Sequence, residues 1–283
     1  MNKKQSALFD TWYRLKKNKL AVVSLGVLVF LFLLAIFAPL IAPYDYAAQN
    51  HARLFEGPSR DHLLGTDRLG RDVLSRLIYG TRQSLSIGLI SIGIAASIGV
   101  TLGAVAGYFG KWVDNLSMRF LDVYQSIPMF LLAVTLAAVL GPSLRNAVIA
   151  LGFSMMPVYA RIMRAAVLTV REKEYVEAAR AINARHPRII VRHIVPNTMA
   201  PIIVELTMGM GSTILAGAAL SFIGLGVQPP IPEWGAMITD ARHVMRDAPH
   251  LAMFPGIMLM LTVLSFNLLG DGLRDALDPR LKN

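Results

Sequence analysis

The sequence contains no cysteine, so disulfide bonds, thiolate catalysis and cysteine-based metal sites are all excluded. It also has little charge: 16% of its 283 residues are Asp, Glu, Lys or Arg, against about 25% in an average soluble domain. Hydrophobic residues make up 54% of the chain, and the mean hydropathy is +0.51. These values predict an integral membrane protein.

Several enzyme motifs are missing as well. No G-x-x-x-x-G-K-[ST] occurs, so the chain has no phosphate-binding loop of its own. Neither H-E-x-x-H nor G-x-S-x-G occurs, and no two of the six histidines are four residues apart. We therefore expect neither an intramembrane protease nor a zinc enzyme, and no catalytic residue, metal or cofactor in this chain.

The net charge of +10 comes from 28 Lys and Arg against 18 Asp and Glu. No basic run is interleaved with aromatic residues, and most basic residues flank apolar segments. This placement predicts contact with the membrane lipid surface rather than with nucleic acid.

Six apolar segments are long enough to cross the roughly 30 Å hydrocarbon core as helices. The first, 20–42, follows a basic tail (1–19). It exceeds the apolar run of about 7–15 residues in a signal peptide, so we expect it to stay uncleaved. A polar segment (43–83) separates it from a five-helix core (84–270), and a short tail (271–283) follows. Spans within the core are expected near 84–107, 118–140, 144–165, 198–227 and 251–270.

Six spans put both termini on one side of the membrane. With that side inside, 19 Lys and Arg lie in the cytoplasm and 9 lie outside. The excess of positive charge predicts cytoplasmic N- and C-termini.

The polar segment includes an amphipathic stretch just before the second span. Its apolar side is Val73, Leu74, Leu77 and Ile78, and its polar side is Arg71, Asp72, Ser75 and Arg76. With Gly80 as its end, the stretch predicts a separate helix lying at the outer surface of the membrane.

Glycines recur every four residues in the second span, at Gly99, Gly103 and Gly107. Small residues at this spacing let helices approach closely in lipid, which favours a packing role over a pore-lining one. Asp122 and Glu205 are the acids within the expected spans. Each is a candidate either for the transport pathway or for a solvated position near the helix end. Pro128 should bend the third span.

The one long charged insert between apolar segments is 172–197. Its first half has helical spacing on one apolar face, made of Tyr175, Ala178, Ala179 and Ile182. Asn183 should end this helix in the left-handed conformation. Pro187 suits the first turn of a second helix, which Pro196 should close. Spacing alone fits either an ordinary basic loop or a helix–turn–helix docking element.

The sequence Glu177-Ala178-Ala179, the turn at Asn183, and Ile194 with Pro196 resemble the EAA loop of ATP-binding-cassette importer permeases. The family more often has Gly at 183 and Leu at 195. The resemblance implies a coupling helix that docks into a cytoplasmic ATPase. The residues given this role are Tyr175, Glu177, Ala178, Ala179, Ala181, Ile182, Asn183, Ile194 and Pro196.

Other motifs resemble the dipeptide, oligopeptide and nickel branch of these permeases. They include Gly65-Thr66-Asp67 and Gly70-Arg71-Asp72 before the second span, and Trp234-Gly235, Gly270-Asp271-Gly272 and Asp278-Pro279 later, similar to the second permease subunit of peptide importers. Some relatives carry Glu where this chain has Gly217. The pathway candidates are thus Asp122, Pro128, Glu205 and Gly217.

The resemblance implies an all-α type I importer permease fold with six transmembrane helices in a bacterial inner membrane. It also implies a heterodimer with a second permease, two ATPase subunits that use ATP and Mg, and an extracytoplasmic solute-binding protein. Peptides are the expected substrate, with nickel chelates, glutathione or haem-like solutes as alternatives. A self-contained secondary transporter or channel is the alternative class. It would need ionisable groups at the membrane midplane, and the cores of spans one, two and six have no charge.

Overall fold

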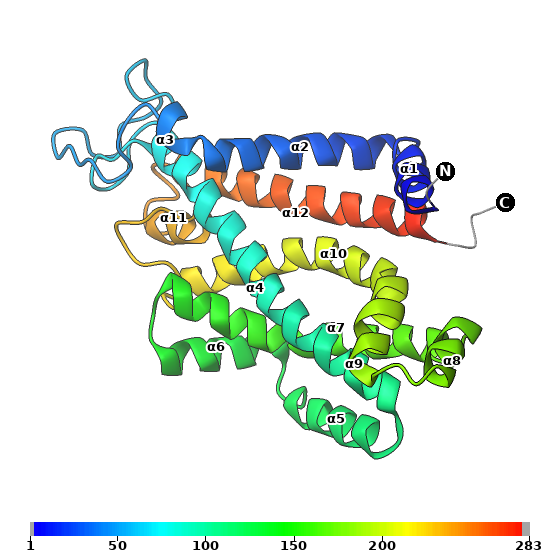
Figure 1. Cartoon of the computed structure of the whole chain (residues 1–283). Helices are drawn as coiled ribbons and strands as arrows, with labels where there is room; N and C mark the ends of the chain where they lie inside the picture. Colours follow the sequence, from blue (N-terminus) through cyan, green and yellow to red (C-terminus); the bar gives the residue numbers. More distant parts are fainter. Residues whose placement is uncertain (1–2, 279–283) are drawn as a thin grey trace.

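The computed structural model describes residues 3–278, and every regular element within them is a helix (Figure 1). Five helical runs are long and apolar enough to cross a membrane: α2 (Lys19–Ile36), α4 (Val73–Phe109), α7 (Leu144–Val170), the run His186–Phe222 that ends in α10 (Val195–Phe222), and α12 (His250–Leu277). The bent pair α5 (Lys111–Tyr124) and α6 (Met129–Leu140) makes a sixth. The chain is a multi-pass membrane protein with the predicted all-α fold. Residues 1–2, and 279–283 of the predicted tail, lie outside the described residues.

The long helices pack into a bundle whose two ends differ. Both termini lie at one end, together with α1 (Lys3–Leu15) and α8 (Glu174–Ala181) (Figure 1). The opposite end carries α3 (Ala38–Ile41), α11 (Trp234–Ala241) and the segment 43–72. We call these the terminal end and the loop end. α2, α12 and α10 lie side by side, while α4 crosses the bundle from the loop end to the terminal end (Figure 1).

A line of glycines brings α4 against α7. A Cβ added to Gly99 would lie 2.5 Å from the Met156 carbonyl oxygen, and one on Gly103 would overlap the Ala160 carbonyl oxygen. A Cβ on Gly107 would lie 2.9 Å from Cβ of Val167. No side chain fits at these positions, so the missing side chains are what allow the two backbones to meet.

The prediction of a separate helix at the membrane surface is wrong. Val73 begins α4, which continues through Gly80 into the span without a break. Asp72 caps this helix, because its carboxylate accepts a 2.7 Å hydrogen bond from the Ser75 amide. Gly80 packs against an indole instead of ending a helix: a Cβ there would lie 3.1 Å from Trp234.

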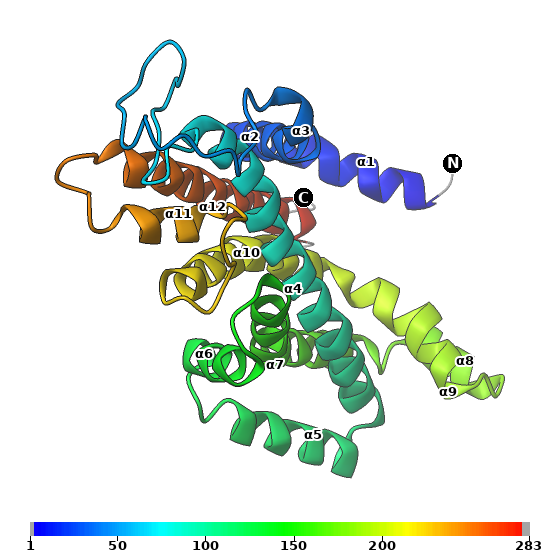
Figure 2. The ribbon, with the colours of Figure 1, turned by 90° about the vertical axis from the view of Figure 1, so that its left-hand side faces the viewer.

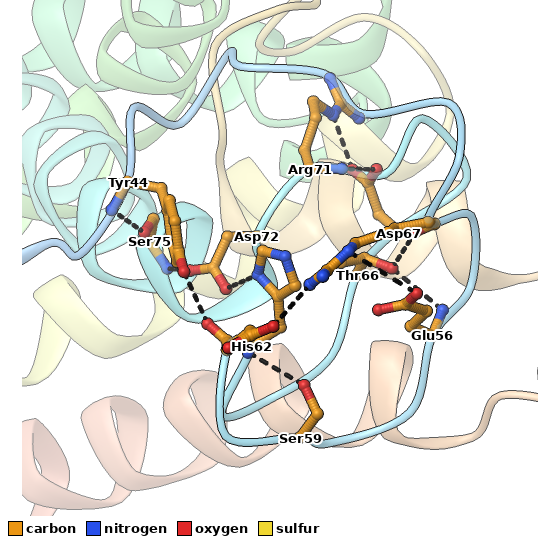
Figure 3. A network of polar contacts seen from close by, with 11 residues as sticks. Tyr44, Glu56, Ser59, His62, Thr66, Asp67, Arg71, Asp72 and Ser75 are labelled. Carbon is orange, nitrogen blue, oxygen red and sulfur yellow. Dashed lines mark hydrogen bonds and ion pairs between the residues drawn. The ribbon is translucent and has the colours of Figure 1, made fainter.

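The polar side of the same stretch is buried, because acids of the loop end face its arginines. Arg71 is 2% exposed and Arg76 is 4% exposed. The Asp67 carboxylate lies 2.6 Å from Arg71 and 3.4 Å from Arg76, and Asp240 lies 3.5 Å from Arg71. Nearby, the His62 ring nitrogen lies 2.9 Å from Asp72 (Figure 3). Both buried arginines thus have a carboxylate partner, which offsets the cost of burying their charge.

The short helix α11 is fixed at the loop end by a buried carboxylate. Glu233 is fully buried and accepts hydrogen bonds from the amides of Gly235 and Ala236, both at 2.9 Å, and from the Ser84 hydroxyl at 3.0 Å. The Trp234 indole donates to the Leu77 carbonyl oxygen at 3.2 Å. The segment before α12 is therefore held on the first turns of α4.

Several predicted spans differ in their bounds from the observed helices. The third is broken: α5 and α6 meet at 76°, and Pro128 stands just before α6, where its missing amide hydrogen costs no helical hydrogen bond. The fifth predicted span, 198–227, corresponds to the helical run His186–Phe222, which begins 12 residues earlier than predicted. The sixth span extends to Leu277, so the first part of the predicted tail is helical.

Candidate coupling site

The charged insert 172–197 joins α7 to α10 at the terminal end of the bundle. It contains α8, α9 (His186–Ile189) and a π-helical turn (Ile190–Ile194) before α10 begins. Figure 2 shows α8 and α9 projecting away from the packed spans. The insert therefore extends beyond the packed spans at the terminal end.

The first half of the insert forms the predicted helix, and only a narrow strip of it is buried. Val176 and Ala179 are the buried residues of α8. Of the predicted apolar face, Ala179 is buried, whereas Ala178 is exposed, Tyr175 is 40% exposed and Ile182 is 80% exposed. A short helix that touches the bundle along one line leaves its other apolar side chains in solvent. Five exposed residues form what we call the docking face: Tyr175, Glu177, Ala178, Ala181 and Ile182.

The turn after α8 has the predicted left-handed geometry. Asn183 has φ of 55°. The Ala184 amide donates to the Ala179 carbonyl at 3.1 Å, and the Asn183 amide donates to the Arg180 carbonyl at 2.9 Å. These two hydrogen bonds form a Schellman motif, which satisfies carbonyls that the helix end leaves free. The chain direction changes at this residue.

The helix in the second half of the insert does not end at Pro196, contrary to the prediction. Ile189 and Ile194 are fully buried, and the helix continues past exposed Pro196 into the span. The π-helical turn explains how: the Val195 amide donates to the Ile190 carbonyl, five residues back. Pro196 then falls in the first turn of α10, where an amide hydrogen is not required.

Sequence reasoning missed one residue of α4 that contacts the insert. Tyr108, at the end of α4, places its hydroxyl 2.8 Å from Nδ1 of His186. Arg180 of α8 lies over the same phenol ring, 5.2 Å from its centroid. The aromatic pair Tyr108-Phe109 at the end of a span was the available signal, but nothing in the sequence pairs it with a histidine 78 residues away.

The four pathway candidates lie on three elements: Asp122 on α5, Pro128 just before α6, and Glu205 and Gly217 on α10. Asp122 of α5 is exposed and pairs with Arg161 of α7 at 2.6 Å. Glu205 lies partly buried within α10. Gly217 is buried, and a Cβ there would lie 2.5 Å from Cγ2 of Ile87, so it has a packing contact with α4. No group of three or more His, Asp or Glu that could hold a metal ion occurs among the described residues.

Comparison with known families decides what kind of protein this is. Residues 99–283 match the family described as binding-protein-dependent transport system inner membrane component. Residues 6–58 match the N-terminal TM domain of oligopeptide transport permease C. The chain belongs to this family of ABC-importer permeases. It is accordingly a transport subunit and not an enzyme, and its EAA segment lies in the projecting insert.

Relatives of similar length support the assignment over nearly the whole chain. The dipeptide transport system permease protein DppC of Alkalihalophilus pseudofirmus is 47% identical over 274 residues, covering 97% of this chain and 90% of the relative. The glutathione transport system permease protein GsiD of Pectobacterium atrosepticum is 45% identical over 277 residues, covering 97% and 91%. The similarity therefore includes both ends of the bundle.

Solved structures share the fold at low sequence identity. The MetNI methionine ABC transporter in an inward-facing conformation matches with a TM-score of 0.59 and 18% identity, covering 72% of this chain and 96% of that chain. An amino acid ABC transporter matches with a TM-score of 0.54 and 17% identity, covering 70% and 92%.

Proposed function

We propose that this permease imports di- and oligopeptides as one half of a heterodimeric pathway. A solute-binding protein delivers the peptide at the loop end, and two ATPase subunits supply the energy at the terminal end. The names of the relatives support a peptide-like substrate: one is a dipeptide permease and another a glutathione permease, and glutathione is itself a tripeptide.

The observation that carries the proposal is the projecting insert. Its docking face combines apolar side chains with the single carboxylate of Glu177, and none of these five residues is buried in this chain. Exposed Tyr and Ile side chains around a charge are typical of a protein interface. A cytoplasmic ATPase that binds this face would be coupled directly to α7 and α10, which flank the insert.

We also propose how the chain is oriented in the membrane and which membrane it occupies. The terminal end carries both termini and the basic insert, so we place it in the cytoplasm by the distribution of Lys and Arg, in a bacterial inner membrane. ATP and Mg belong to the partner ATPases, because this chain has no phosphate-binding loop. One bundle of six helices is small for a peptide pathway, which supports a second, homologous permease beside it.

Substrate choice is tested with the complete complex in proteoliposomes. Uptake of a labelled dipeptide should be competed by other dipeptides and not by nickel or haem. If reduced glutathione competes better than every dipeptide and is itself accumulated, the glutathione alternative replaces the first proposal. Accumulation of nickel without any peptide uptake would refute both.

A further inference from the structure

Tyr108 links the end of span α4 to both halves of the insert. It is buried, at 6% exposure, although it is the second-last residue of the helix. Its hydroxyl is hydrogen-bonded to His186 of α9 at 2.8 Å, and the Arg180 guanidinium of α8 lies over its ring. These partners stand on either side of the Asn183 turn. One side chain therefore touches the insert before and after the point where its direction changes.

The remaining contacts of the insert with the spans are largely apolar. Val176, Ala179, Ile189 and Ile194 pack in a cluster with side chains of α4 and α7, among them Ala104, Met163 and Val167. Apolar packing is non-directional, whereas a hydrogen bond weakens steeply when its angle changes. Two hydrogen bonds near the insert end on backbone carbonyls: Thr198 of α10 donates to Ile194, and Arg171, just before the insert, donates to Gly107 of α4, both at 3.1 Å. Within residues 3–278, the Tyr108–His186 bond is the one hydrogen bond between a side chain of the insert and a side chain of α4. It is suited to fix the rotation of the insert.

We propose that Tyr108 and His186 are positioning residues for energy coupling. They hold the docking face at a fixed angle to α4, so that a movement of the bound ATPase is transmitted to the spans instead of being absorbed by the turn. The inference rests on the proposed role of the insert as the ATPase-docking element. A neutral His186 with its proton on Nε2 accepts the phenol hydrogen at Nδ1. Arg180 adds a cation–π contact to the same ring.

Removing one hydroxyl tests the link. Tyr108→Phe keeps the ring, its packing and the Arg180 contact, and removes only the hydrogen bond. In proteoliposomes with the complete complex, we expect about 2- to 10-fold more ATP hydrolysed per solute imported, the factor that corresponds to losing one neutral hydrogen bond. The matched control is Tyr124→Phe, whose hydroxyl donates to the Phe153 carbonyl at 3.2 Å, away from the insert. The control should match the wild type.

Variants of His186, the hydrogen-bond partner of Tyr108, distinguish a positioning role from a role in protein stability alone. His186→Asn keeps a polar group close to the position of Nδ1 and should restore most of the coupling. His186→Leu should behave like Tyr108→Phe. The double variant Tyr108→Phe, His186→Leu should be no worse than either single variant, because residues in one hydrogen bond are not additive. Additive losses would mean that the two residues act separately, which would overturn the proposal.

A distance measurement tests the same link without any substrate. The chain has no cysteine, so spin labels can be placed at Trp112→Cys and Arg188→Cys, two exposed positions near α4 and on α9. In the assembled complex, Tyr108→Phe should broaden the distance distribution between the labels, and Tyr124→Phe should not. An unchanged distribution together with unchanged ATP per solute would refute the positioning role. Failure of peptide uptake in the wild type would instead refute the proposed substrate, and the distance result would still stand.

Discussion

At the scale of single residues, the most informative position is Asn183, because its backbone geometry is unusual for a residue with a side chain. Its φ of 55° lies in the left-handed region, which costs most residues roughly 1–2 kcal/mol. Asn is among the few non-glycine residues that adopt it regularly. The direction of the chain between α8 and α9 therefore depends on which residue stands here.

The effect of a substitution at Asn183 should depend on how readily the new residue adopts positive φ. Asn183→Gly should support ATP-driven uptake at or near the wild-type rate, because glycine adopts positive φ without strain. Asn183→Val should reach the membrane but lose the ATPase subunits, because a β-branched residue resists this conformation. Co-purification of the ATPases with each variant is the measurement. Equal ATPase binding by both variants would show that the turn geometry is unimportant for docking.

Charge at the docking face gives a second residue-scale prediction. Glu177→Arg should abolish uptake while the protein still inserts in the membrane, because the reversed charge would meet a like charge in the interface. Glu172→Arg is the control: Glu172 is exposed, and it precedes α8 and lies outside the docking face. Normal uptake and complex assembly by the Glu177 variant would count against a place at the interface.

At the scale of helices, the contact between α4 and α7 depends on backbone proximity. A Cβ on Gly103 would overlap the Ala160 carbonyl, whereas Gly93 of the same helix has no atom within 4 Å of an added Cβ. Gly103→Ala should therefore destabilise the protein by about 1–3 kcal/mol, the usual cost of overpacking. Gly93→Ala should be neutral or slightly stabilising, because glycine inside a helix costs about 0.5–1 kcal/mol relative to alanine. Thermal unfolding in detergent compares the two, and equal melting temperatures would contradict the packing role.

The helices also show which features can be predicted from the sequence and which cannot. Apolar length predicted the spans, because crossing lipid requires about 20 apolar residues whatever the neighbours. The turn at Asn183 was predictable because its cause is local. Burial of Arg71 and Arg76 was not, because it depends on Asp67 and, through the tertiary fold, on Asp240. For the same reason, no local pattern indicated that Glu233 would cap α11 and accept a hydrogen bond from Ser84 of α4.

At the scale of the whole molecule, the two ends should face opposite sides of the membrane. The absence of cysteine allows single labelling sites on an unmodified background. Gln49→Cys, in the exposed segment of the loop end, should react with a membrane-impermeant maleimide in intact spheroplasts. Ile182→Cys, on the docking face, should react only after lysis when the chain is expressed without its ATPase subunits. The reverse pattern would invert the proposed orientation and remove the ATPase from the docking face.

In the proposed function, this permease is powered by ATPases bound to its terminal end and not by an ion gradient. The direct test is labelled-dipeptide accumulation in proteoliposomes, compared between the complete complex and the chain without its ATPases. We predict accumulation by the complete complex with ATP on the ATPase side, and none by either preparation with a proton or sodium gradient alone. Gradient-driven accumulation by the chain without ATPases would contradict the account, because it would make the protein a self-contained secondary transporter.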